Sequence, residues 1–351
     1  CLNIGLTLVV WLGAARVDSG QIKPGVILAF LTYFNMVLQG VMGVNRIFIM
    51  VSKASASANR IAQVLEIEPD QRVLAPEEAR TPAGDEFIRF EHVNFSYGEA
   101  TEHSLAGGER EQCLYDINFA LRRGESLGII GPTGCGKSTI INLLMRFYDV
   151  EDGGVFVDGR DVRTYEKDEL HRKFGVVFQN DMVFFNTLRE NIRFGRDLDD
   201  TALTRAVEDA VAAEYIDSLE EGLDYRADIK GANLSGGQRQ RLLISRALAG
   251  NPEILILDDS SSALDYATDS ALRKALRGLR GTTTVFLVSQ RISGVQQADK
   301  ILVLDNGSLV GCGRHEELLK NCAVYKDIYY SQFPEERPQT KEAEGQTDEN
   351  A

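Results

Sequence analysis

The chain has 351 residues with a formal net charge of −14, and a chain of this length is typical of two domains. Residues 1–51 carry Arg16, Lys23 and Arg46 against Asp18, a net of +2, so the remainder carries −16. An acidic soluble part argues against a nucleic-acid-binding surface, which needs a basic face. The five cysteines show neither metal-ligand nor disulfide spacing, and we expect free thiols.

The N-terminal part is predicted to cross a membrane. Leu2–Ala15 is an apolar run, and Val26–Asn45 holds twenty residues without a charge, which is long enough to span a bilayer. The polar segment Asp18–Gly25 between them contains Gly and Pro and indicates a loop. The chain opens inside an apolar run without Met, so we expect residues 1–65 to be the last two helices of an N-terminally truncated transmembrane domain. A buried core helix is the alternative for the second run.

Three polar residues, Asn35, Gln39 and Arg46, share one face of the second helix. Polar groups in membrane helices face the bundle or a water-filled cavity, or they form hydrogen bonds between helices. The sequence leaves both readings open.

The rest of the chain divides by composition. Residues 66–86 are rich in Pro and charge and are predicted to be a linker, residues 87–332 a second domain, and residues 333–351 a disordered acidic tail. Within the second domain the apolar or alternating runs predicted as strands are Phe87–Tyr97, Leu114–Leu121, Ser126–Ile130, Gly175–Phe178, Glu253–Leu257, Thr284–Val288, and a hairpin around Asn306-Gly307. Helical patterns between them, at 181–231 and 238–248, predict an α/β fold with a largely parallel sheet.

One stretch carries the chemistry. It fits G-x-x-x-x-G-K-[ST] at every fixed position and consists of Gly131, Pro132, Thr133, Gly134, Cys135, Gly136, Lys137, Ser138 and Thr139. A buried strand precedes it and a helix follows, so backbone N–H groups and the helix dipole converge on an anion. We expect Lys137 to reach the β- and γ-phosphates of ATP and Ser138 to bind Mg²⁺. Asp258, at the end of an apolar strand, is the carboxylate that orders Mg²⁺ in such proteins.

Cys135 lies inside this loop, next to the start of a helix. A helix N-terminus lowers a thiol pKa, so the sequence predicts a reactive thiol that bound nucleotide protects. The alternative is that packing hides the sulfur.

The order of these motifs resembles the ATP-binding cassette (ABC) transporters over roughly residues 1–330. The run Leu234, Ser235, Gly236, Gly237 and Gln238 is similar to their signature sequence, and it precedes the Asp258 strand as in that family. Tyr97 stands where the family stacks an aromatic on adenine, Gln179 where it has the Mg²⁺-binding Q-loop, and Ser262 to Asp265 where it has the D-loop.

The resemblance implies a P-loop NTPase cassette with a mainly parallel sheet, an antiparallel subdomain and a helical subdomain, preceded by an all-α transmembrane domain. It also implies a multi-pass protein of the cell (inner or plasma) membrane with a cytoplasmic cassette. In this family the signature contacts ATP held by a second cassette. Ser235, Gly236 and Gly237 are therefore expected to offer N–H groups to a partner's γ-phosphate.

Two positions depart from the family pattern. Asp259 replaces the Glu that polarises the attacking water, and Gln290 replaces the His that contacts the γ-phosphate. A carboxylate shorter by one methylene is displaced by about 1 Å, which can cost about a hundredfold in rate. Gln290 can donate a hydrogen bond but carries no charge. The two changes together predict a degenerate site that binds ATP and hydrolyses it slowly.

An intact signature beside a degenerate site is the pattern of one half of heterodimeric bacterial multidrug exporters. The partner would then carry Glu and His at the matching positions, and the solute would be hydrophobic or amphipathic. Two alternatives stay open. One is a slow homodimeric exporter of lipid or peptide, and the other is a nucleotide-gated regulatory module without transport.

Overall fold

A computed structural model describes the chain except for residues 1, 67–70, 99–111, 151, 260–263 and 338–351. The chain splits into two compact units, Cys1–Asp70 and Gln71–Ala351, which are described one at a time. Most of the acidic tail and most of the loop before Cys113 lie outside the described residues.

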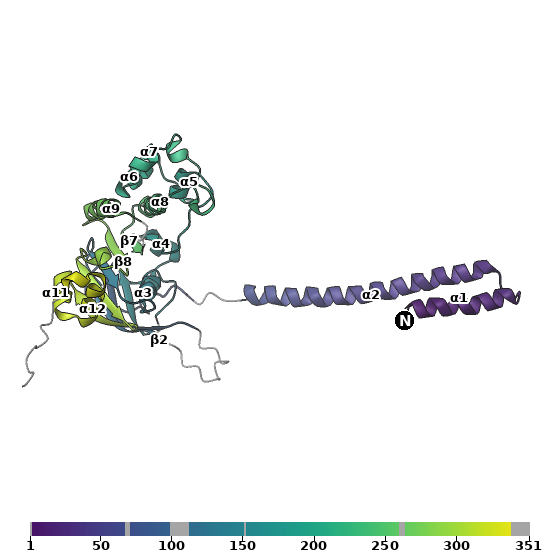
Figure 1. Cartoon of the computed structure of the whole chain (residues 1–351). Helices are drawn as coiled ribbons and strands as arrows, with labels where there is room; N and C mark the ends of the chain where they lie inside the picture. The colour runs from purple at the N-terminus through teal and green to yellow at the C-terminus, as the bar shows by residue number, and fades with distance from the viewer. Residues whose placement is uncertain (1, 67–70, 99–111, 151, 260–263, 338–351) are drawn as a thin grey trace, which may run out of the picture. The chain divides into compact units, whose positions relative to one another are not determined.

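The first unit is a pair of helices, α1 (Leu2–Asp18) and α2 (Pro24–Leu65), joined by a short turn (Figure 1). Glycine lets the two helices approach closely, because a Cβ on Gly13 would come within 2.9 Å of the Ile27 side chain. The 42 residues of α2 give a helix of about 63 Å, about twice the thickness of a bilayer core.

Among the described helices, α2 alone is long and apolar enough to cross a membrane. The other expected membrane helix is present as α1. Its 17 residues are fewer than the roughly 20 that usually span a bilayer. On the polar face of α2 the Asn35 amide donates to the Leu31 carbonyl of the same helix at 3.0 Å. Both readings of that face therefore stay open.

The second unit is built on one ten-stranded sheet with the order β5-β4-β1-β2-β10-β9-β3-β8-β7-β6. Its strands are β1 (Ile88–Ser96), β2 (Gln112–Leu121), β3 (Ser126–Ile130), β4 (Asp152–Val157), β5 (Arg160–Asp161), β6 (Phe174–Val177), β7 (Ile254–Asp258), β8 (Thr284–Val288), β9 (Lys300–Asp305) and β10 (Ser308–Gly313). The α-helices are α3 (Lys137–Leu144), α4 (Lys167–Arg172), α5 (Leu188–Arg193), α6 (Asp200–Asp209), α7 (Ala213–Asp217), α8 (Gly236–Leu248), α9 (Tyr266–Gly278), α10 (Ile292–Val295), α11 (His315–Asn321) and α12 (Ala323–Gln332).

The sheet is mixed, with a parallel part and an antiparallel part. Strands β9, β3, β8, β7 and β6 run parallel, and β5, β4, β1 and β2 pair antiparallel. The predicted hairpin is present as β9 and β10, and its turn residues Asn306 and Gly307 have φ values of 45° and 77°. The expected sheet with a parallel part and an antiparallel part is confirmed.

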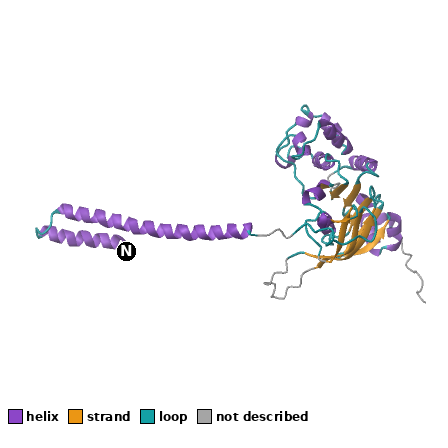
Figure 2. Ribbon diagram, turned by 180° about the vertical axis from the view of Figure 1, so that it is seen from behind, coloured by secondary structure: helices purple, strands orange, loops and turns teal. Residues whose placement is uncertain are grey.

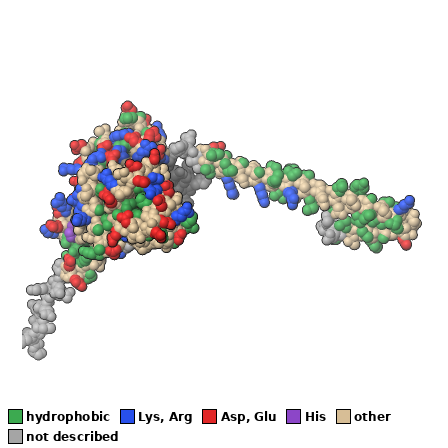
Figure 3. All heavy atoms as spheres, turned by 90° about the horizontal axis from the view of Figure 1, so that it is seen from above, with side chains coloured by type: hydrophobic (Ala, Val, Ile, Leu, Met, Phe, Trp, Pro, Cys, Tyr) green, Lys and Arg blue, Asp and Glu red, His purple; other side chains and the backbone are tan. Residues whose placement is uncertain are grey.

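Three groups of apolar side chains hold the unit together. One lies between the antiparallel strands and α3, a second joins α5, α6 and α8 to β7 and β8, and a third lies beneath α10 and α12. Figures 1 and 2 show the sheet in one part of the unit and α5 to α8 gathered as a helical subdomain in another. The visible face in Figure 3 carries charged side chains of both signs on this unit, whereas much of the α1–α2 pair is hydrophobic.

The parallel strands align their carboxyl ends at one edge of the sheet. Val177 pairs with Leu257, Asp258 with Val288, and Ile129 with Val288. Loops that follow such strands meet in a crevice at that edge, which is where ligands bind in open α/β sheets.

Candidate functional site

The phosphate-binding loop connects β3 to α3. Two of its glycines lie in the left-handed region, Gly134 at φ 83° and Gly136 at φ 99°, which glycine adopts without steric cost. A Cβ on Gly136 would lie 2.5 Å from the Leu114 side chain, and one on Gly131 would collide with the Leu304 carbonyl. The N-cap residue of α3 is Gly136, which has no side chain to cap the helix, so the N–H groups of its first turn remain available to an anion.

Lys137, the first residue of α3, folds back over the loop. Its Nζ donates to the Gly131 carbonyl at 2.9 Å and to the Pro132 carbonyl at 2.8 Å. The ammonium group therefore lies above the concave side of the loop, where it can exchange carbonyl contacts for phosphate oxygens.

A second group of polar atoms suits a magnesium ion. The Ser138 hydroxyl lies 3.4 Å from Asp258 Oδ2, although these residues are 120 positions apart in the chain. Burial raises the pKa of the Asp258 carboxyl, the neighbouring Asp259 raises it further, and Ser138 and Lys137 act in the opposite direction. A divalent cation would offset this crowding of negative charge.

The donor set fits Mg²⁺ better than a transition metal. Within the described residues, no group of three His, Cys, Asp or Glu side chains could hold a metal. Mg²⁺ commonly takes one or two protein oxygens and completes its shell with phosphate and water. Ser138, Asp258 and Gln179 would hold the ion, and the ion would neutralise charge on the phosphates.

Tyr97 follows β1 and lines the same cleft as Asp258. Its hydroxyl donates to Thr139 Oγ1 at 3.1 Å and accepts from Asn142 Nδ2 at 3.3 Å. Its ring meets Phe95 and Tyr148 edge-on, with centroid distances of 4.9 and 5.1 Å. These contacts orient the ring while leaving it partly exposed, as a stacking platform for a base requires.

The two unusual positions also reach this crevice. Asp259 has φ 50° and donates its N–H to the Val288 carbonyl at 2.8 Å, and an Asp tolerates this conformation. Gln290 follows β8 and is exposed.

A single open cleft of about 320 Å³ joins these parts. Its lining includes most of the predicted nucleotide-binding and catalytic residues: Tyr97, Thr133, Gly134, Gly136, Lys137, Ser138, Thr139, Gln179, Asp258, Asp259 and Gln290. Gly131, Pro132 and Cys135 do not line it, although the first two hold Lys137. Cys113 and Ser289 line it as well, and sequence reasoning missed both. Cys113 lies near the start of β2 and Ser289 directly follows β8. Closeness to the end of a predicted strand is the sequence feature that could have indicated them.

The signature sequence lies outside this cleft, at the start of α8. Leu234 is buried, whereas Ser235 and Gly236 are exposed. Ser235 Oγ accepts from Gln238 N at 3.2 Å, and Gln238 Oε1 accepts from Ser235 N at 2.9 Å, which forms a capping box. The Ser235 N–H is thus occupied within the chain, which corrects the expectation that it is free. The available donors here are the Gly236 and Gly237 N–H groups and the Ser235 hydroxyl.

Of the two D-loop residues, Ser262 lies outside the described residues. Asp265 caps α9 by accepting from Thr268 N at 2.9 Å and from Thr268 Oγ1 at 2.8 Å. Hydrogen bonds from Thr268 hold the pKa of the Asp265 carboxyl below its ordinary value. Asp265 does not line the cleft.

The expected reactivity of Cys135 is wrong. Its side chain is 3% exposed, and burial raises the pKa of the thiol even though Lys137 acts in the opposite direction. Desolvation disfavours the thiolate, and here it outweighs the charge and dipole at the start of α3. Cys135 is a packing residue beneath the loop.

Comparisons with known proteins give one consistent result. A family model described as ABC transporter matches residues 114–262. An uncharacterised ABC transporter ATP-binding protein of Mycobacterium tuberculosis (strain ATCC 25618 / H37Rv) is 36% identical over 335 residues, covering 94% of this chain and 56% of the relative. An ATP-dependent lipid A-core flippase of Desulfotalea psychrophila (strain LSv54 / DSM 12343) is 36% identical over 325 residues, covering 92% of this chain and 55% of the relative.

A solved structure agrees with these relatives. A bacterial Atm1-family ABC exporter with ATP bound superimposes with a TM-score of 0.70 and 26% identity, covering 94% of this chain and 56% of that one. The chain therefore spans about half the length of the curated relatives it matches.

Proposed function

The chain belongs to the ABC transporters and carries their ATP-binding cassette, and we propose that it is one subunit of an ATP-driven exporter whose own nucleotide site is degenerate. The observation that carries the proposal is the pairing of a nucleotide cleft containing Asp259 and Gln290 with an exposed signature that lies outside that cleft.

The cleft has the parts needed to hold ATP. Tyr97 offers its ring to the adenine, the first turn of α3 and Lys137 bind the phosphates, and Ser138 with Asp258 and Gln179 hold Mg²⁺. None of these roles requires a proton to move. Tight nucleotide binding is therefore compatible with slow hydrolysis.

The parts that act on the attacking water are weaker. Asp259 extends one methylene less than Glu, so its carboxylate stands farther from the γ-phosphate region. Gln290 can donate a hydrogen bond there, but it cannot supply the positive charge of a protonated His. This site would keep its ATP bound while the partner's site hydrolyses ATP repeatedly.

The signature would complete that second site. The exposed N-terminus of α8 presents N–H groups and the positive end of a helix dipole, which favour a γ-phosphate. This chain's own cleft does not include them. A second cassette with Glu and His at the positions of Asp259 and Gln290 is the partner that this arrangement suits, and the two would close head-to-tail on two ATP molecules.

The α1–α2 pair would be the end of a multi-pass domain in the cell membrane. Arg46, Lys53 and Arg60 repeat every seven residues along the second half of α2, and basic residues beside a span favour the cytoplasmic side. The cassette follows that half of α2 and would therefore be cytoplasmic. A hydrophobic or amphipathic solute is the cargo class that we propose, by analogy with multidrug exporters.

Removing the ring of Tyr97 tests the nucleotide pocket. Stacking is worth about 1–3 kcal/mol per base, so Tyr97→Ala should weaken binding of ATP and ADP alike by about 5- to 150-fold. Titration calorimetry with Mg·ATP and Mg·ADP measures both affinities. Tyr97→Phe keeps the ring and loses only the hydroxyl, and it should bind nearly as the wild type does. Unchanged affinities in Tyr97→Ala would reject the adenine platform.

The composition of the purified exporter tests the partner. When this chain is tagged and isolated in detergent from its own cell, we expect native mass spectrometry to show a 1:1 complex with a second, different ABC chain. The slow homodimeric exporter of lipid or peptide predicts two copies of this chain and no other subunit. That result would replace the heterodimer in this proposal.

A further inference from the structure

The short segment from Ser289 to Arg291, between β8 and α10, carries Gln290 at the edge of the cleft. Arg291 N donates to Ser289 Oγ at 3.0 Å. Ser289 N donates to the Ile129 carbonyl at 3.1 Å, and Gly294 N donates to the Arg291 carbonyl at 2.9 Å. None of these three bonds involves the backbone of Gln290, which is exposed, so a fixed conformation at that residue needs further contacts.

Gln332, the last residue of α12, provides two such contacts. Its Nε2 donates to the Gln290 carbonyl at 2.8 Å, and its Oε1 accepts from the Ile292 N–H at 2.9 Å. The two bonds lie on either side of Arg291 and join positions 42 and 40 residues apart in sequence. A side-chain amide supplies a donor and an acceptor together, as few other side chains do.

The end of α12 is itself firmly placed. Its own residues Tyr325 and Tyr329 are buried, and the Tyr325 hydroxyl lies 2.8 Å from His315 Nδ1 on α11. Gln332 is thus fixed to a packed part of the unit and not to a mobile surface.

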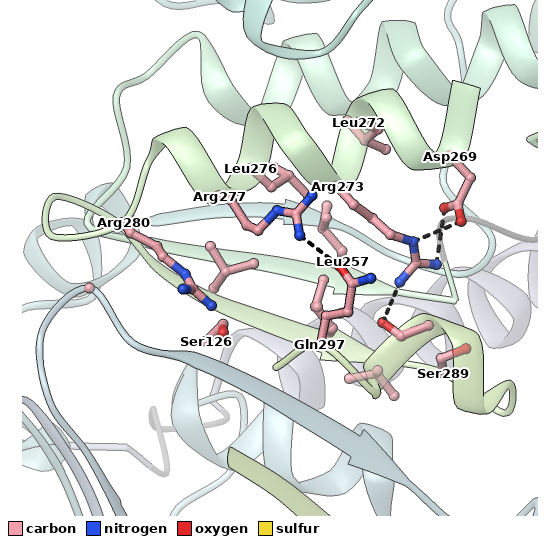
Figure 4. A pocket seen from close by; sticks show the side chains of 15 residues that line it. Ser126, Leu257, Asp269, Leu272, Arg273, Leu276, Arg277, Arg280, Ser289 and Gln297 are labelled. Carbon is pink, nitrogen blue, oxygen red and sulfur yellow. Dashed lines mark hydrogen bonds and ion pairs between the residues drawn. The ribbon is translucent and has the colours of Figure 1, made fainter. Parts of the chain in front are cut away.

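Helix α10 follows this segment, and two arginines of α9 contact α10 and the residues after it. In Figure 4, Arg273 is oriented by Asp269 at 2.7 Å and donates to the Gly294 carbonyl at 2.9 Å. Arg277 donates to Gln297 Oε1 at 3.0 Å in the same view. The contacts from α9 hold α10 and the residue Gln297 after it. The two bonds from Gln332 hold the backbone at Gln290, just before α10.

We propose that Gln332 is a positioning residue, which holds the backbone at Gln290 so that the Gln290 amide points to the γ-phosphate of bound ATP. This inference rests on the proposed nucleotide site. Because ADP lacks the γ-phosphate, the contribution of Gln332 would appear as a preference for ATP over ADP and not as affinity for both.

The test is equilibrium binding of Mg·ATP and Mg·ADP to the purified chain in detergent. Gln332→Ala should lose about tenfold in ATP affinity, the value of one hydrogen bond to a charged group, with ADP affinity unchanged. Gln290→Ala should show the same loss. Since both changes remove one contact, the double variant should lose no more than either single variant.

Ser331→Ala is the matched control, because within the described part of the chain the Ser331 hydroxyl donates only to the Ile328 carbonyl of the same helix, at 2.7 Å. It should bind both nucleotides as the wild type does. Equal loss of ATP and ADP affinity in Gln332→Ala, additive losses in the double variant, or no loss at all would each overturn the role of Gln332. If the wild-type chain binds neither nucleotide, the proposed nucleotide site is wrong, and the role of Gln332 falls with it. If the wild type binds both and only the Gln332 results fail, the site stands and the role of Gln332 alone is wrong.

Discussion

Replacing Gly236 with Asp is expected to lower the steady-state ATPase of the purified exporter by about 100- to 1,000-fold, the cost of losing one preorganised donor to a developing anion. Gly236 is the first residue of α8 and is exposed. An added carboxylate there would repel the γ-phosphate of a partner's ATP and deny it the helix N-terminus.

The same change should leave the fold intact. Acidic residues stabilise the first turn of a helix. The capping box is formed by Ser235 and Gln238 alone, so a side chain at position 236 does not take part in it. Thermal unfolding and ATP binding to this chain's own cleft are the controls, and both should match the wild type. Loss of ATP binding by the isolated Gly236→Asp chain would contradict the assignment of the signature to a partner's site.

Lys137→Ala is expected to weaken ATP binding to this chain by about 10- to 150-fold, because a hydrogen bond to a charged group contributes about 1.5–3 kcal/mol. The ammonium group lies directly over the loop, held by the Gly131 and Pro132 carbonyls. ADP binding should fall less, since the γ-phosphate accounts for part of the contact.

Lys274→Ala provides the matched control for charge, since Lys274 is exposed on α9 and does not line the cleft. Calorimetry on the two variants and the wild type separates a local contact from a general electrostatic effect. Equal ATP affinity in Lys137→Ala and Lys274→Ala would show that the phosphates bind elsewhere.

The parts of the site that sequence predicts well are those that depend on local pattern. The loop from Gly131 to Thr139 follows from its glycines, and β3 and β8 have the bounds predicted for them because their residues form uninterrupted apolar runs. Helix α8 begins at Gly236, two residues before the predicted Gln238. The Ser235-x-x-Gln238 spacing is that of a capping box, and it predicts a helix that starts directly after Ser235.

Other features depend on contacts between distant segments. The Cys135 thiol is buried in an apolar cluster that includes Leu304, a residue far away in the sequence, so no local rule gives its pKa. Gln332 meets Gln290 across 42 residues, and Ser138 meets Asp258 across 120. The ABC family pattern supplied the second of these pairings, whereas nothing in the sequence indicated the first.

The central claim is that this chain holds ATP in its own cleft and completes a working site in a partner. The most direct test is the steady-state ATPase of the purified exporter with Asp259→Asn or Gly236→Asp in this chain, measured side by side. The account predicts that Asp259→Asn stays within about threefold of the wild type, a small change in activation free energy, while Gly236→Asp is nearly inactive. If Asp259→Asn abolishes the activity, this chain's site is a working one and the slow homodimeric exporter is the better description.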